Sequence, residues 1–259
     1  MMILALESSA TACSAALCRD GELVAQSYQN SGLTHSRTLL PMVRDMLENC
    51  QLTLEQVDVI AVAAGPGSFT GLRIGVATAK GLAWPGDKDC APCSTLESMA
   101  WPLAHMAGSL IVCAMDARRK QVYNALFLAT GTGLERLTPD RAISLEDLGA
   151  ELKNYENSKI VVGDGAKLCY NTLTEEGIPM TLAPKHLRMQ SAWGVARAAE
   201  ELAARGELVK GGALVPSITA CLRRNGSGLP GKNLNNKRRA SPCLTKKFMF
   251  WTTPCCSIS

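Results

Sequence analysis

The sequence predicts a duplicated α/β fold with two lobes, each built on a mixed sheet flanked by helices. An apolar strand that ends in an acid occurs twice, as Ile3–Leu6 before Glu7 and as Leu110–Met115 before Asp116. After each of these strands we expect a hairpin, a helix, a buried strand and a second helix. The two acids are about 109 residues apart. Such a repeated unit indicates duplication, and the alternation of strands and helices indicates the α/β class.

The elements of the first half follow from local signals. Asp20-Gly21, a dipeptide typical of hairpin turns, separates the apolar runs Cys13–Cys18 and Glu22–Tyr28. Apolar residues at helical spacing predict a helix over Ser36–Asn49. We then expect the strand Val57–Ala63, a glycine-rich turn, a helix from about Thr70 to Trp84, and a helix that starts near Ser94.

In the second half, strands are expected at Gln121–Leu128 and Leu134–Ile143, with a glycine-containing turn between them. Helices at 145–153 and 190–206 should flank the strand Lys159–Val162. We therefore expect a first lobe at residues 1–106, a second lobe at 107–216, and a separate tail at 217–259.

The positive net charge comes from this tail. Residues 217–259 contain eight of the 27 Lys and Arg and none of the 23 acids, so the rest of the chain, with 19 bases, carries −4. The body therefore does not predict a basic face for RNA. The N-terminus lacks a basic leader and no apolar run approaches the roughly 20 residues of a membrane span, so we expect a cytoplasmic protein without membrane contact.

The cysteines outside the tail lie among apolar neighbours, which favours buried thiols in a reducing compartment. Cys90 and Cys93 have the C-x-x-C spacing of a redox pair, and that interpretation stays open beside the first.

The glycine-rich segment Gly65–Ala83 has two features. Ser68 or Thr70 can cap the helix that follows, and such turns can also bind phosphate through free N–H groups, although no P-loop pattern is present. Gly71, Gly75 and Ala79 recur every four residues, so they make a smooth ridge that another helix could approach closely.

A docking face is one interpretation of this ridge, together with the methionine-rich helix 36–49; a contact within the lobe is the other. The candidate interface residues are Leu39, Met42, Val43, Met46, Gly71, Ile74, Gly75, Thr78 and Ala79.

A search for catalytic groups finds little. The three histidines (His35, His105 and His186) are far apart in sequence, and no metal-binding or nucleophile-elbow motif occurs. We therefore predict no catalytic residue, no metal site and no cofactor. A nucleotide-phosphate neighbourhood is conceivable at Glu7, Ser8, Ser9 and Asp116, and strand-end acids that accept local N–H groups are an equally good interpretation.

Several motifs resemble those of the TsaB (YeaZ) family and occur in the same order along the chain. They are, in chain order, Ile3–Ser9, Cys13–Leu17, His35–Met42, Gly65–Ala83, Ser94–Glu97, Met115–Arg119 and Gly163–Gly165. The resemblance covers about residues 1–216 and implies the actin-like, RNase H-like (ASKHA) fold. It also implies a scaffold role in adding threonylcarbamoyl, from a TsaC-made adenylate, to the tRNA adenosine next to the anticodon. The implied partners are a TsaD-type transferase and a TsaE-type ATPase, and the chain would contact tRNA only through the complex. The resemblance further implies that a homodimer can form through the helices at 36–49 and 70–84.

The resemblance also bears on catalysis. The transferase of this superfamily carries two metal-binding histidines on the helix after the glycine-rich helix, and the matching positions here are Thr95 and Met99. This supports a non-enzymatic accessory subunit. The alternatives are a metallopeptidase-like protein or an ATP-binding small-molecule kinase of the same superfamily.

The tail after Ser217 is interpreted as the product of a reading-frame slip. Its composition changes abruptly, and four of the 11 cysteines fall within it. From the last base of the Ile218 codon, allowed codons permit the peptide Tyr-Arg-Leu-Pro-Gln-Ala-Glu-Arg and a further amphipathic stretch before a stop. That peptide resembles the family's ending, whereas the present tail has no amphipathic period and is expected to be disordered.

Overall fold

The computed structural model describes residues 1–217, and both of its sheets belong to one compact unit. The first sheet has six strands. They are, in spatial order, β12 (Val209–Lys210), β5 (Asp89–Ser94), β4 (Val59–Gly65), β1 (Met2–Glu7), β2 (Cys13–Arg19) and β3 (Glu22–Gln29). β1 pairs antiparallel with β2 and parallel with β4, and all of its residues are buried, as its unbroken apolar run predicts. The interpretation of the tail lies outside the described residues.

The second sheet repeats this arrangement. Its spatial order is β11 (Thr181–Leu182), β10 (Lys159–Val162), β6 (Leu110–Asp116), β7 (Gln121–Ala129) and β8 (Leu134–Arg136), and β9 (Arg141–Ser144) also pairs with β7. β6 pairs antiparallel with β7 and parallel with β10, as β1 does with β2 and β4. The order β3-β2-β1-β4-β5 therefore recurs as β8-β7-β6-β10-β11, which confirms the predicted duplicated fold.

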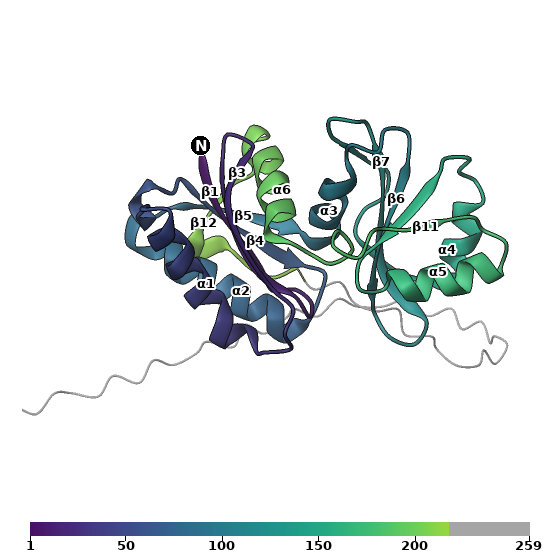
Figure 1. The fold of residues 1–259 in the computed structure, drawn as a ribbon, viewed down its shortest axis with the longest axis horizontal. Coiled ribbons are helices and arrows are strands. Elements are labelled where there is room, and N and C mark those ends of the chain that lie inside the picture. The colour runs from purple at the N-terminus through teal and green to yellow at the C-terminus, as the bar shows by residue number, and fades with distance from the viewer. Residues whose placement is uncertain (218–259) are drawn as a thin grey trace, which may run out of the picture. The chain divides into compact units, whose positions relative to one another are not determined.

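Helices cover both faces of each sheet. On the first sheet, α1 (His35–Asn49) and α2 (Phe69–Ala83) lie on one face and α6 (Ala192–Ala204) on the other, as Figure 1 shows. On the second, α4 (Leu145–Leu152) and α5 (Ala166–Glu175) cover one face and the short α3 (Thr95–Ala100) the other. Short 3-10 turns occur at Leu54–Gln56 (η1), Trp84–Gly86 (η2), Trp101–Leu103 (η3) and Gly211–Ala213 (η4). Within the described residues no helix is long and apolar enough to cross a membrane.

The structure corrects three element predictions. The strand expected over Leu134–Ile143 is two strands, β8 and β9, which both pair with β7. The sequence does not predict the strands β5, β11 and β12 or the helix α5.

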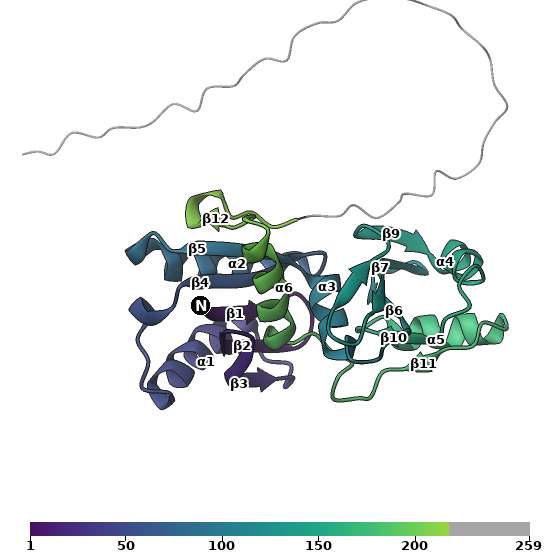
Figure 2. The ribbon, with the colours of Figure 1, turned by 90° about the horizontal axis from the view of Figure 1, so that it is seen from above.

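The helix expected at 190–206 does not flank β10, because α6 packs on the first sheet and α5 takes that place (Figure 2). α6 presents a row of alanines to the first sheet and lets Gly194 come close to α3, where a Cβ at 194 would lie 2.0 Å from the Ser98 carbonyl oxygen. Residues 192–210 therefore return to the first lobe, although the predicted boundaries assigned them to the second.

Candidate functional site

The glycine-rich turn and the start of α2 fit against the end of β1. Ser68 caps α2, because its hydroxyl accepts a hydrogen bond from the Gly71 N–H at 3.3 Å. The Ser8 hydroxyl donates to the Gly71 carbonyl at 2.9 Å. A Cβ at Gly71 would lie 2.0 Å from the Ser8 carbonyl oxygen, and one at Gly75 would lie 2.5 Å from the Ser8 hydroxyl. The small-residue ridge of α2 therefore faces β1 of its own lobe.

The predicted interface divides into buried and accessible residues. Six of the nine are buried in the first lobe: Leu39, Val43, Met46, Gly71, Gly75 and Ala79. The other three, Met42, Ile74 and Thr78, are partly exposed. The buried six shape the two helices from within, so direct contact with a partner would have to come from other side chains.

Exposed apolar side chains do occur on and next to these helices, outside the nine predicted interface residues. Leu40 on α1 and Phe69 on α2 are 53% and 52% exposed, and Trp84, directly after α2, is 84% exposed. The Arg73 guanidinium stacks over the Phe69 ring at 3.7 Å. The helical spacing of the sequence counts Leu40 with the core stripe of its helix, whereas the structure buries Leu39, Val43 and Met46 and leaves Leu40 exposed.

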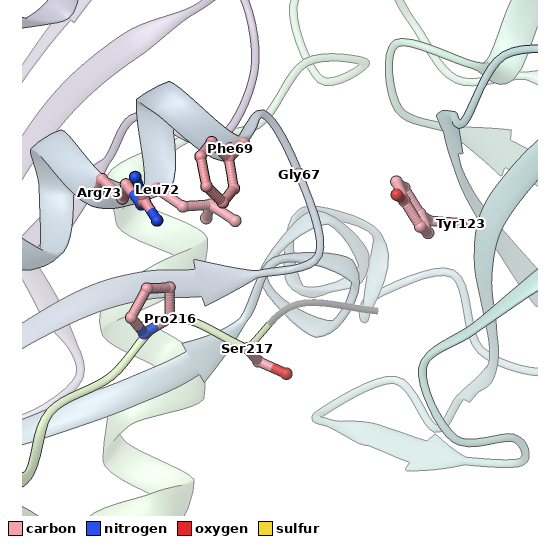
Figure 3. Close-up of a pocket in the computed structure, with 7 residues that line it drawn as sticks. All are labelled: Gly67, Phe69, Leu72, Arg73, Tyr123, Pro216 and Ser217. Atoms are coloured by element: carbon pink, nitrogen blue, oxygen red, sulfur yellow. The ribbon is translucent and has the colours of Figure 1, made fainter. Parts of the chain in front are cut away.

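A cleft of about 630 Å³ lies between the β1–β2 turn, the start of α2 and the β6–β7 turn. Of the predicted phosphate neighbourhood, Ser9 and Asp116 line this cleft, whereas Glu7 and Ser8 do not. Glu7, Ser8 and Ser9 are all fully buried. A pocket of about 100 Å³ adjoins it, with Phe69 and Tyr123 on opposite sides in Figure 3. The structure thus brings together the ends of the two duplicated strands β1 and β6.

Acidic groups dominate the electrostatics at this place. Burial raises the pKa of the Glu7 carboxyl from 4.5 to about 7, and the charge of Asp164 adds to the effect. The pKa of Asp164 is also raised, mainly by desolvation, although the Gln190 side-chain amide donates to its carboxylate at 3.2 Å. Asp164 lines the cleft and is accessible to water, so its desolvation comes from the protein around it rather than from complete burial.

The two strand-end acids accept hydrogen bonds from the turns that follow them. Glu7 Oε1 accepts the Ser9 N–H at 2.6 Å, and Asp116 Oδ1 accepts the Arg118 N–H at 2.7 Å. A bound phosphate would need N–H groups of this kind. The geometry therefore supports the interpretation in which these acids satisfy local N–H groups over the one in which they adjoin a phosphate.

The positions that match the metal-binding histidines are part of the core. Thr95 is fully buried, and Met99 packs in the cluster between α3 and the second sheet. The His35 Nε2 donates to the Ala10 carbonyl at 2.7 Å, whereas His105 and His186 are exposed. Across residues 1–217, no three His, Cys, Asp or Glu side chains lie close enough together to hold a metal ion.

The redox interpretation of Cys90 and Cys93 is wrong. Both lie on β5, where Cys90 joins the core beneath α1 and α2 and Cys93 joins the core beneath α6. Side chains three apart on a strand point to opposite faces, so these thiols cannot pair. Burial also raises the pKa of both thiols, which disfavours the reactive thiolate.

Comparison with known proteins agrees with this architecture. The family model of TsaD, tRNA N6-adenosine threonylcarbamoyltransferase, matches residues 29–204. The chain is 36% identical over 168 residues to the tRNA threonylcarbamoyladenosine biosynthesis protein TsaB of Bacillus subtilis (strain 168), a match that covers 65% of this chain and 73% of that protein. It is 32% identical over 167 residues to TsaB of Escherichia coli (strain K12), which covers 64% and 72%. The solved structure of YeaZ from Pseudomonas aeruginosa is similar with a TM-score of 0.71 and 27% identity, over 83% of this chain and 98% of that one.

Proposed function

The chain belongs to the TsaB family, and from this premise we propose that it is a non-catalytic scaffold subunit in the synthesis of threonylcarbamoyladenosine, next to the anticodon of tRNA. The relatives of Bacillus subtilis and Escherichia coli are named for that biosynthesis. In this proposal the chain binds a TsaD-type transferase, works with a TsaE-type ATPase, and contacts tRNA only as part of the assembled complex. The cytoplasm, where tRNA is modified, is the expected location.

The observation that carries the proposal is the apolar surface on α1 and α2. The two helices contact each other on the same face of the first sheet. Leu40, Phe69 and Trp84 are each more than half exposed there, and such side chains on neighbouring helices are typical of a surface that another protein covers. Met42 and Ile74 extend this surface with their partly exposed side chains. We define it as the α1/α2 surface.

The residues at the core positions and at the strand ends support a scaffold over an enzyme. A metallopeptidase would need a ligand set that the core positions Thr95 and Met99 cannot supply. A small-molecule kinase would need N–H groups free to bind phosphate, and those of Ser9 and Arg118 already donate to carboxylates. Both alternatives are therefore less well supported than a role in binding.

The test is copurification of the full chain with a tagged TsaD-type paralogue. Leu40→Lys places a charge on the α1/α2 surface without touching the core, because Leu40 is 53% exposed. We expect at least about tenfold weaker binding, which corresponds to about 1.4 kcal/mol. The matched control is Met106→Lys, an exposed apolar residue (40%) outside both helices, which should bind like the unmodified chain.

Equal binding by both variants would contradict the α1/α2 assignment. Gly75→Leu, a large side chain on the small-residue ridge of α2, does not serve this purpose. Its side chain would meet the Ser8 hydroxyl and Val62 inside the lobe. A loss of binding would then report damage to the fold, and not a lost partner contact.

A further inference from the structure

The strand β3 forms one edge of the first sheet and pairs only with β2 (Figure 2). An edge strand presents unpaired N–H and C=O groups to which another extended chain can bind. We propose that β3 binds an extended, antiparallel segment of a different protein, with apolar side chains at alternate positions and an acidic residue near its N-terminal end. The apolar side chains fill a groove between β3 and α1. This inference is independent of the α1/α2 surface.

β3 is the long edge among the sheet edges of residues 1–217. β12 and β11 have two residues each and β8 has three, so these edges offer little main chain to a partner. β3 has eight residues, about 27 Å of strand, and contains no proline and no basic residue, which are the usual protection of an edge. Main-chain pairing along β3 can therefore supply affinity for an extended segment.

A groove of about 650 Å³ lies beside this edge, between residues 25–29 of β3 and the flank of α1. Ala25 and Ser27 lie on the face of β3 that is turned to α1, because their partners on β2 belong to the core beneath that helix. These small residues leave the groove open, and the adaptable side chains of Met42 and Met46 line it on the helix side. A segment paired with β3 places every second side chain over this β3/α1 groove.

One charged side chain of the groove is free to bind an acid. Arg37, on the first turn of α1, is exposed, and within residues 1–217 its guanidinium forms no ion pair or hydrogen bond. Asp45, farther along the helix, is already paired with Arg44 at 2.8 Å. Arg37 lies at the end of the groove where β3 ends at Gln29, so it favours an acidic residue at the N-terminal end of an antiparallel segment.

A second copy of this chain does not fit the groove. In a pairing of two β3 strands, the residues that the second strand turns toward α1 are again small, because Ala25 and Ser27 occupy those positions. The groove stays open in such a pair, and its apolar lining remains in contact with water. The occupant must therefore have alternate side chains that are larger than those of β3.

The probe is a fluorescently labelled peptide, acetyl-Glu-Thr-Leu-Thr-Leu-Thr-amide, whose anisotropy is measured as the full chain is titrated in. Antiparallel pairing with the acid beside Gln29 sets the leucines opposite Ser27 and Ala25. We expect a dissociation constant of about 0.1 mM or tighter. A peptide of the same composition with adjacent leucines should bind about tenfold more weakly, because one leucine then points away from the groove.

Variants of the chain test the groove and its charge. Ser27→Leu fills the groove and should weaken the probe about tenfold. The matched control is Gln26→Leu, whose side chain lies on the α6 face because Gln26 pairs with a residue of the core beneath α6, and it should bind like the unmodified chain. Arg37→Glu should weaken the probe about threefold in low salt. A probe with Lys in place of Glu should recover that loss, which also shows that the variant is folded.

The main-chain pairing has a test of its own. N-methylation of alternate amides of the probe removes the N–H groups along one of its two edges. Only one edge of the probe pairs with β3, so the two alternately methylated probes should differ about tenfold or more in affinity.

A probe that does not bind, equal binding of the two methylated probes, or equal effects of Ser27→Leu and Gln26→Leu would overturn the inference. So would a fall in bound probe as the chain concentration rises, because a second copy would then occupy the edge. Copurification of the Ser27→Leu variant with the TsaD-type paralogue should be unchanged. Failure here is therefore distinguishable from failure of the proposed function.

Discussion

The buried carboxyl of Glu7 predicts that the protein loses stability as the pH rises from 5 to 8. Its pKa is about 7 in the folded chain and 4.5 in the unfolded one, because the end of β1 excludes water. Between these values the folded state keeps a proton that the unfolded state has released. The unfolded state therefore binds fewer protons, and the free energy of unfolding falls with rising pH. The full shift corresponds to about 3 kcal/mol, and most of that change falls between pH 5 and pH 8.

Glu7→Gln should remove this loss. The amide oxygen can still accept the Ser9 N–H, and the side chain has no proton to release. We expect the variant to gain about 2 to 3 kcal/mol of stability relative to the unmodified chain between pH 5 and pH 8, as measured by urea unfolding at both values. Glu48→Gln, on the exposed side of α1, is the control and should unfold with the same pH dependence as the unmodified chain. Parallel pH profiles for the Glu7 variant and the unmodified chain would refute the reasoning.

Three further predictions concern other parts of the chain. Gly71→Ala should lower the melting temperature by several degrees in a thermal scan, because its Cβ would lie 2.0 Å from the Ser8 carbonyl oxygen; an unchanged midpoint would show that β1 and α2 separate easily. The purified chain should contain no stoichiometric zinc or iron and should not transfer threonylcarbamoyl alone; one metal per chain by elemental analysis, or turnover without partners, would contradict this. Resequencing the gene should show a one-base slip near the codon of Ile218, and an intact frame through Ser259 together with a protease-resistant tail would disprove it.

Elements with a regular apolar period were predictable from the sequence. The strands β1 and β6, the hairpin through Gly21, and the helices α1 and α2 carry their signals locally, so their existence follows from the chain alone. The sequence does not predict β5, because Pro92 interrupts its apolar pattern and a proline within an apolar run argues against a strand. Its place in the sheet is set by pairing with β4, a contact that is distant in sequence.

The candidate site shows a different limit. The spacing of Gly71 and Gly75 correctly indicates that something comes close to α2, but a small side chain does not specify its neighbour. The neighbour is Ser8 of the same lobe, 63 residues earlier than Gly71 in the chain. In the same way, periodicity identifies the apolar side of α1 and cannot tell whether the sheet or a partner covers it. Leu39 faces the sheet and Leu40 faces solvent, although they are neighbours in sequence.

The return of α6 to the first sheet has a consequence for how the protein is made. One face of β1 and β2 stays uncovered until α6 has been synthesised, and β12 closes the sheet next to β5 only after that. On the ribosome, the first half of the chain therefore exposes apolar surface while the whole second lobe is translated. The second lobe has its strands and its flanking helices α4 and α5 in one continuous stretch and can form earlier. The part that begins first in sequence is thus completed last, and a nascent chain that stops before Ala192 would present an incomplete first sheet to chaperones and proteases.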